Sequence, residues 1–276
     1  MANYTTAQIK QLREQTGAGM MDVKRALDEA DGDLTKAMEI IRVKGLKGLA
    51  KREGRSTSDG LVAALVTGQR GVMIELNSET DFVAKAPKFI ELGAQIVKAA
   101  EALEAADLES VLAAQIEGGT SVAEAIDTLA ASIGEKLQLR RVAQVTGQHV
   151  ELYLHKTNPD LPPQVGVLIA TDQAGAAVAH DVAMHIAAYS PSFLSRQDVP
   201  EETVANERRI AEETAKEEGK PEAALPKIVD GRMNGFFKEN VLLDQGFAKD
   251  PKLSVAQVFA PTGGLPTSFA RFRVGA

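Results

Sequence analysis

The sequence of 276 residues contains no cysteine and no tryptophan, and aromatic residues make up only 4% of it. The absence of cysteine excludes disulfide bonds, thiol catalysis and cysteine-ligated zinc or iron–sulfur sites. Because aromatics are so few, the apolar 44% of the chain is mostly Ala, Val, Leu and Ile. Such a composition favours helix packing and small α+β layers over an aromatic-lined ligand pocket. At this length we expect two or three structural units.

Long apolar runs are absent as well. The N-terminal stretch MANYTTAQIKQLREQ has no apolar signal core, and no segment reaches the roughly 18 apolar residues that span a bilayer. We therefore expect a cytoplasmic protein with no membrane contact. The net charge of −7 argues against wholesale binding to a phosphate backbone, although it leaves room for a local basic patch.

Motifs for nucleotide binding and covalent catalysis are also missing. The sequence has no G-x-x-x-x-G-K-[ST] and no G-x-S-x-G, and GAGMMD at 17–22 lacks the third glycine of a dinucleotide loop. The four histidines show no metal-ligand spacing, and the segment DGD at 31–33 opens like a calcium loop but has Arg42 where a glutamate is needed. We expect no catalytic residue, no metal, no cofactor and no direct nucleotide binding, so the protein is not an enzyme.

The N-terminal residues have the pattern of a three-helix module. Apolar residues recur at helical spacing, and Thr6 and Asp33 stand at the positions of helix N-caps. From Arg42 to Arg55 cations dominate and glycines interrupt the pattern, which is typical of a basic, partly flexible linker. Two interpretations of this strip stay open: a solvated linker, or an electrostatic docking strip for an acidic partner or RNA.

A weak internal repeat follows the linker. Residues 60–65 and 71–76 predict a β-hairpin that leads into a helix, and residues 150–155 and 166–171 predict a second hairpin that leads into another helix. Between the two halves, residues 101–146 have a helical pattern that ends in a short run, VAQV. These patterns predict one α+β unit used twice.

Charged residues dominate one segment of the second half. Residues 201–220 include eleven charged side chains, and a Gly-Lys-Pro break separates them from another helical stretch. Two polar helices around such a break predict an antiparallel hairpin that stands off the body. Its role is open between a solvated excursion and a contact or dimerisation arm. The final segment, TSFARFRVGA, alternates like an edge strand.

The chain is therefore predicted to be an α+β protein of four parts. The parts are the N-terminal module with its linker, the two copies of the repeated unit and the polar hairpin.

The two halves of the repeat differ at one point. Gly71 to Ile96 spans 25 residues and Gly166 to Ile186 spans 20, so the first half has five extra residues, which fall around SETDF at 78–82. An insertion that carries a large aromatic raises two alternatives.

Phe82 can serve the fold or a partner. In the first alternative Thr80 or Asp81 caps the new helix and Phe82 folds back on the body as a hydrophobic staple. In the second, the turn holds the ring and the carboxylate outward to wedge into another protein. The pattern alone does not choose between them.

Five segments resemble a known family: TGAGMMDVKRAL, ETDFVAK, IGEKLQLRRV, AMHIAA and PKIVDGRMNGFFKENVLLDQ. Their order and spacing, from about residue 3 to residue 274, resemble bacterial translation elongation factor Ts, the guanine-nucleotide exchange factor of elongation factor Tu. The resemblance implies a three-helix module similar to ubiquitin-associated domains, a core of two related α+β subdomains and an inserted helical hairpin. Together with the patterns, it implies these bounds: the module with its linker at 1–55, one core subdomain at 56–147, a second at 148–195 and 238–276, and the inserted hairpin at 196–237.

The resemblance also implies a partner and the residues that meet it. In the family, an Asp-Phe pair inserts its aromatic ring between helices of the GTPase domain of Tu and disturbs the region that holds the nucleotide's Mg²⁺. Thr80, Asp81, Phe82 and Val83 occupy those positions here. Further positions that match family contacts with Tu are Lys24, Arg52, Ile133, Gly134 and His155. The expected function is promotion of GDP release from Tu in translation elongation.

The sequence departs from the family in several places. Arg52 stands where relatives carry lysine, the turn after His155 is longer than in some relatives, and Gln245-Gly246-Phe247 stands where many have Gln-Pro-Phe. Many members continue past the last strand with a further helical module that touches Tu, so a chain ending at Ala276 is expected to lack that contact.

Two questions stay open at this point. A homodimer, or a dimer of heterodimers with Tu, is compatible with the predicted arm. The alternative function is an RNA-binding or ribosome-associated scaffold that uses the basic strip at 42–55, although the net charge and the lack of stacking aromatics count against it.

Overall fold

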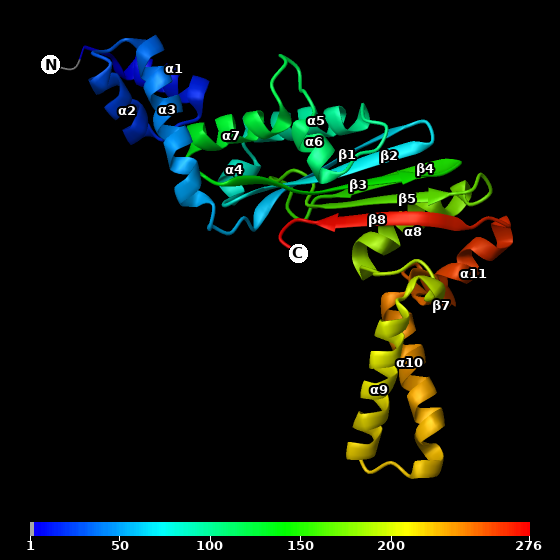
Figure 1. Cartoon of the computed structure of the whole chain (residues 1–276). Coiled ribbons are helices and arrows are strands. Elements are labelled where there is room, and N and C mark those ends of the chain that lie inside the picture. Colours follow the sequence, from blue (N-terminus) through cyan, green and yellow to red (C-terminus); the bar gives the residue numbers. More distant parts are fainter. Residues whose placement is uncertain (1–2) are drawn as a thin grey trace.

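The computed structural model describes residues 3–276, apart from the side chains of residues 46, 47 and 49–51. Met1 and Ala2 of the predicted module, and the side chains of Lys47 and Lys51 in the predicted basic strip, lie outside the described residues. The chain forms an N-terminal helical module, a body of two stacked sheets with helices on both outer faces, and a helical hairpin that projects from the body (Figure 1). This mixture confirms the α+β prediction.

The N-terminal module consists of α1 (Thr6–Thr16), α2 (Met20–Glu29) and the first part of α3 (Leu34–Arg52). The N-cap of α1 is Thr5 rather than Thr6, because the Thr5 side chain accepts a hydrogen bond from the backbone N–H of Gln8. Asp33 caps α3 as predicted. The three helices close over a small apolar core formed by Leu12, Val23, Ala26, Leu27, Ala37 and Ile41.

Helix α3 continues through most of the predicted linker and ends at Arg52. The helix lies against α7 (Val122–Ile133), and at Gly45 the approach is so close that a Cβ would lie 2.2 Å from the carbonyl oxygen of Ala131. Packing of this kind outweighs the low helix propensity of glycine. The prediction of a linker is therefore wrong for residues 42–52.

The first sheet contains β1 (Asp59–Thr67), β2 (Arg70–Ser78) and β3 (Leu137–Thr146), antiparallel and in that order. Helices α5 (Pro87–Glu101), α6 (Leu108–Ala113) and α7 cover its outer face (Figure 1). Val72, Ile74 and Leu76 on β2 pack under these helices, whereas Met73 faces the second sheet. The alternation explains how one strand is buried on both faces.

The second sheet contains β4 (His149–His155), β5 (Val165–Thr171) and β8 (Pro266–Arg273), also antiparallel and in that order. Helix α8 (Ala176–Tyr189) covers its outer face. The two sheets meet in an apolar layer that includes Val62, Met73, Val150, Leu168 and Phe272. Both predicted hairpins, each followed by a helix, are confirmed, and β8 is an edge strand as predicted.

The predicted helical pattern over 101–146 extends too far. Gly134, with φ of 88°, ends α7, and β3 begins at Leu137. The run LQL at 137–139 is therefore strand rather than helix, because Leu137 and Leu139 pair with β2 and pack into the core. Pairing with a neighbouring strand overrides a local pattern that is compatible with either structure.

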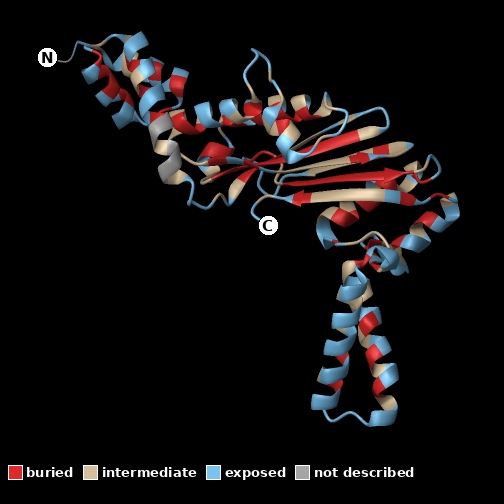
Figure 2. Ribbon diagram, in the orientation of Figure 1, coloured by how far each residue is buried: buried red, intermediate tan, exposed pale blue. Residues whose placement is uncertain are grey.

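The projecting hairpin consists of α9 (Glu201–Glu217) and α10 (Leu225–Asn240). Its buried residues lie where the two helices face each other (Figure 2), with Ala211, Val229 and Met233 at the centre. The predicted antiparallel hairpin is confirmed, and its dimerisation role stays a prediction. The chain returns to the body through β6 (Gly246–Phe247), β7 (Asp250–Ser254) and α11 (Val255–Phe259).

Across residues 3–276, no helix is both long enough and apolar enough to cross a bilayer.

Candidate functional site

The inserted residues of the first repeat lead from the end of β2 into a single helical turn, α4 (Asp81–Ala84), which precedes α5. Phe82 on this turn is 74% exposed, whereas Val83 and Ala84 are buried in the core beneath α5. The turn thus has one apolar side that faces the body and one large aromatic ring that faces solvent. Thr80 stands at the N-cap of α4, as the first alternative expects, but Phe82 does not fold back as a staple. The second alternative, insertion into another protein, stays a prediction.

One cation lies against the exposed ring. The ammonium nitrogen of Lys85 lies 4.4 Å from the centre of the Phe82 ring and 3.4 Å from the Asp81 carboxylate. On the neighbouring strand β1, burial and, to a lesser degree, the Asp81 charge raise the pKa of the Asp59 carboxyl. The turn therefore presents a ring and a carboxylate together, with one cation placed between them.

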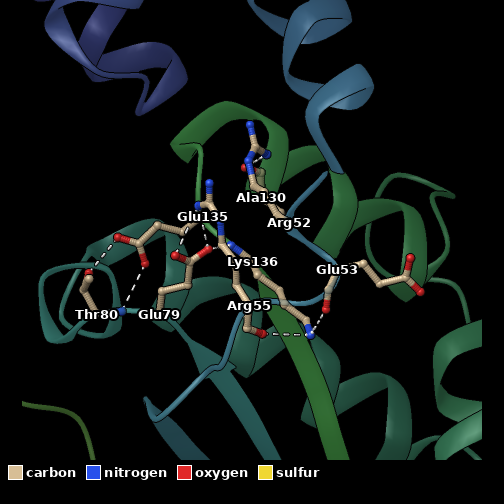
Figure 3. Close-up of polar contacts among 8 residues, drawn as sticks. All are labelled: Arg52, Glu53, Arg55, Glu79, Thr80, Ala130, Glu135 and Lys136. Carbon is tan, nitrogen blue, oxygen red and sulfur yellow. Dashed lines mark hydrogen bonds and ion pairs between the residues drawn. The ribbon is translucent and has the colours of Figure 1, made fainter. Parts of the chain in front are cut away.

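Two carboxylates tie this turn to the loop that follows α7 (Figure 3). Glu135 accepts hydrogen bonds from the Thr80 hydroxyl (2.7 Å) and from the Thr80 backbone N–H (3.1 Å). In the opposite direction, Glu79 accepts a hydrogen bond of 2.6 Å from the backbone N–H of Lys136. Hydrogen bonds to an ionised carboxylate are stronger than neutral ones. The two loops hold each other through reciprocal contacts.

The same loop also fastens the end of the N-terminal module (Figure 3). The Lys136 ammonium donates to the carbonyl oxygens of Glu53 (2.6 Å) and Arg55 (3.1 Å). The Arg55 guanidinium in turn lies 3.2 Å and 3.3 Å from the two Glu79 carboxylate oxygens. The segment that follows α3 is therefore attached both to Glu79, directly before the turn, and to Lys136, in the loop after α7.

Several of the residues implied by the family resemblance come together here. Residues 80–83 form the turn, and Ile133 and Gly134 directly precede the loop that holds it. The Gly134 N–H donates to the Ala130 carbonyl at 2.9 Å, and the Arg52 guanidinium donates to the same oxygen at 3.3 Å. Residues from α3, α4 and α7 thus gather at one end of the first sheet.

Lys24 and His155 lie outside this group. Lys24 is exposed on α2. A cleft of about 190 Å³ separates the module from the end of α7; Asp22 and Gly134 are among its lining residues, and Lys24 is not. His155 is exposed at the end of β4 in the second sheet, with its Nδ1 3.1 Å from the Tyr153 hydroxyl. Within the described part of the chain, neither side chain forms a hydrogen bond or ion pair with α4.

Sequence reasoning missed the residues that hold the turn, which are Arg55, Glu79, Glu135 and Lys136. The available signal was an acid directly before Thr80 and another directly after Gly134, but an acid is a weak signal because most exposed carboxylates are simply solvated. The register of the sheet brings them together: Ser78, the last residue of β2, pairs with Leu137, the first of β3.

The basic strip is partly engaged within the chain. Its cations Lys44, Arg52 and Arg55 contact Glu29, the Ala130 carbonyl and Glu79, respectively. Cations that already have partners in the chain are less available to an RNA backbone.

The site has the features of a binding surface. Among the described residues, no group of three or more His, Asp or Glu is arranged to hold a metal ion. An exposed aromatic ring and a carboxylate lie on a turn that is held by two buried apolar residues and by the hydrogen bonds to Glu135. Such a feature is typical of a protein-binding surface.

Known proteins match this chain over its whole length. A family model described as "Elongation factor TS" matches residues 79–276. Proteins named elongation factor Ts from Beutenbergia cavernae, Micrococcus luteus and Kineococcus radiotolerans are 64%, 63% and 56% identical to it, and each comparison covers 100% of both chains. The match to the family model begins at Glu79 and therefore includes both the turn and the loop that holds it.

Proposed function

The chain belongs to the elongation factor Ts family, and from this premise we propose that it is the guanine-nucleotide exchange factor of elongation factor Tu. It acts in translation elongation, in the cytoplasm, by binding Tu that carries GDP and speeding the release of GDP. No bond is made or broken in this step, so the protein is not an enzyme in the usual sense.

The observation that carries this proposal is the exposure of Phe82. A phenylalanine that is 74% exposed leaves most of its apolar surface in water, and burying such a side chain is worth about 1.5–3 kcal/mol. Aromatic anchors that fill a pocket on a partner dominate many interfaces. In this proposal the pocket for Phe82 lies between helices of the GTPase domain of Tu.

Asp81 is proposed to act beside the Phe82 ring. Mg²⁺ bridges the phosphate oxygens and the protein ligands of a GTPase and neutralises their charge, so a disturbance of its site weakens nucleotide binding. We place Phe82 as the wedge and Asp81 as the charge that perturbs the Mg²⁺ region. Thr80 and Val83 complete the contact.

Exchange then follows from linkage. If the factor weakens the binding of nucleotide to Tu, nucleotide weakens the binding of the factor by the same ratio. GDP leaves, GTP enters and GTP binding expels the factor. The direction comes from the cellular ratio of the two nucleotides, because a catalyst of exchange does not favour either one at equilibrium.

Further contacts with Tu are assigned to Lys24, Arg52, Ile133, Gly134 and His155. Two contacts support this assignment for α3 and α7. The Arg52 guanidinium and the Gly134 N–H bind the same Ala130 carbonyl, and Gly134 directly precedes Glu135, which holds Thr80. We also propose that the four parts predicted from sequence are the domains of the protein.

The test is stopped-flow release of a fluorescent GDP from cognate Tu. Wild-type chain is expected to accelerate release, and Phe82→Ala to lower the release rate at least about 30-fold, as loss of an interface hot spot of 2 kcal/mol or more implies. Leu265→Ala is the matched control, since Leu265 is 62% exposed but precedes β8 in the second sheet. Its release rate is expected to equal that of wild type.

If the wild-type chain leaves the rate of GDP release from Tu unchanged, the protein is not an exchange factor for Tu. The RNA-binding scaffold would then become the leading function, and salt-dependent RNA binding that requires residues 42–55 would be its signature.

A further inference from the structure

The turn that carries Phe82 does not stabilise itself. Helix α4 has only four residues, and so short a helix is unstable on its own hydrogen bonds. Its N-cap residue, Thr80, makes no side-chain cap bond within the turn, in contrast to Thr5, Asp33 and Ser121 at other helices. The Thr80 hydroxyl binds instead to Glu135, 55 residues further along the chain.

The apolar anchors beneath the turn set only which side of it faces the body. Val83 and Ala84 are buried, but apolar contacts have no preferred direction. They hold one side of the turn against the body, and they leave the finer orientation of the opposite, exposed side to polar contacts. Two hydrogen bonds from Thr80 to the two oxygens of one carboxylate do set a direction, because hydrogen bonds weaken steeply when they are misaligned.

Glu135 is itself held from both sides. It follows Gly134, whose left-handed conformation ends α7. It precedes Lys136, whose backbone N–H binds Glu79 and whose ammonium binds the carbonyl oxygens of residues 53 and 55. Figure 3 shows Glu135 reaching toward Thr80 from this fixed loop. A functional group is placed accurately when the residues that support it are themselves fixed.

We propose that Glu135 is a positioning residue for nucleotide exchange, which holds Thr80 so that Asp81 and Phe82 stand in their binding geometry before the partner arrives. The proposal rests on the exchange function proposed above. A turn that is already oriented loses less conformational entropy when it binds. Glu135 acts through Thr80, so its effect on exchange is transmitted by the turn.

The first measurement is GDP release from Tu at saturating concentrations of the factor. Glu135→Ala removes both acceptors and is expected to lower the maximal release rate about tenfold, the usual scale for a hydrogen bond to a charged group. Glu135→Gln keeps one acceptor oxygen and the same length, so we expect it to restore most of the lost rate.

A double-mutant cycle with Phe82→Ala separates positioning from general stabilisation of the fold. If Glu135 acts through the turn, Glu135→Ala has an effect of less than about twofold once Phe82 has been removed, because coupled residues are strongly non-additive. An equal effect in both backgrounds would overturn the proposal.

Glu124 provides a matched control on the same helix. Its carboxylate also accepts hydrogen bonds from the hydroxyl and the backbone N–H of one residue, Ser121, but at the opposite end of α7. Glu124→Ala is expected to leave the release rate unchanged. A tenfold loss with this variant would mean that any such contact matters and would overturn the assignment to Glu135.

A second measurement does not depend on Tu. The backbone N–H groups of Ala84 and Lys85 donate to Thr80 and Asp81, so hydrogen exchange at these two amides reports whether the turn is formed. In the free chain, Glu135→Ala is expected to speed exchange there about tenfold, without the same change in the helix core of α5. Unchanged exchange would overturn the proposal.

These measurements also separate the two proposals. If wild-type chain does not release GDP, the exchange function fails. If wild-type chain releases GDP and Glu135→Ala does so equally well, only the positioning role fails.

Discussion

The ammonium nitrogen of Lys85 lies 4.4 Å from the centre of the exposed Phe82 ring. The same nitrogen is 3.4 Å from the Asp81 carboxylate, so one cation contacts both of the groups that are proposed to enter the partner. In the free chain Lys85 therefore makes a cation–π contact with the ring and an ion pair with the carboxylate. A partner that takes up Phe82 and Asp81 must first displace this cation.

Lys85→Met tests this competition. The variant keeps the apolar stem and removes the charge, and an exposed cation–π contact is worth about 0.5–1 kcal/mol. We expect Tu to bind the variant about two to five times more tightly, measured by titration with a labelled factor. Lys98→Met, an exposed lysine on α5, is the control and should leave the affinity unchanged. Weaker binding of Lys85→Met would show that the partner uses this cation directly.

Gly45→Ala tests the close crossing of α3 and α7. An added Cβ would lie 2.2 Å from the Ala131 carbonyl oxygen, and the helix backbone cannot yield without moving the module. We expect a loss of about 1–3 kcal/mol in the free energy of unfolding, as for other overpacked sites, measured by urea denaturation.

The matched control for that variant is Gly231→Ala, in the interior of α10. Apart from the backbone of its own helix and its two neighbours in the chain, no heavy atom lies within 4 Å of a Cβ built there, so the substitution is expected to stabilise the helix by up to about 1 kcal/mol. If Gly45→Ala stabilises the protein as Gly231→Ala does, the two helices do not cross at contact distance.

His185 makes the stability of the second core half depend on pH. The ring is buried on α8, its Nδ1 accepts from the Ala248 N–H at 3.1 Å, and its Nε2 donates to the Gln245 side chain at 2.9 Å. Burial lowers the pKa of His185 from its ordinary 6.5, and the hydrogen bond with Gln245 opposes this shift only in part. The folded protein therefore binds a proton at this ring less readily than the unfolded chain does.

The sign of the pH effect follows from this lowered pKa. Below about pH 6.5 the unfolded chain takes up a proton at this ring while the folded chain does not, so stability falls as the pH decreases toward the folded pKa. One such group contributes at most about 1.4 kcal/mol per pH unit. Above pH 6.5 its contribution is complete and constant.

Urea unfolding at pH 7.5 and pH 5 checks this expectation. His185→Gln should reduce the loss of stability between the two pH values, whereas His180→Gln, which changes an exposed histidine on the same helix, should keep it. If both variants lose stability as wild type does, the pH dependence arises elsewhere.

Much of the fold follows from local patterns. The hairpin of residues 60–76 alternates apolar residues with strand spacing, and Asp33 stands one residue before a helical pattern, so each predicts its own structure. The polar arm was predicted for the same reason, because two helices around Gly219 need no information from the rest of the chain. Hydrophobic periodicity and capping act between neighbouring residues.

Other features depended on packing. Glycines at 45 and 48 suggested a linker, yet α3 continues through them because Gly45 lets it lie against α7. The run LQL continued a helical pattern, yet it is strand because it pairs with β2. In both cases a contact with a segment distant in the sequence outweighed the local preference.

At the proposed contact site, too, some features follow from the local sequence and others from packing. The sequence by itself determined that an inserted turn with Asp81 and Phe82 follows the second strand, since an insertion and a residue type are local properties. Only the tertiary structure decided that Phe82 points into solvent and that Glu135 holds Thr80. The reason is the register between β2 and β3, which brings together loops that are 55 residues apart and makes their hydrogen bonds possible.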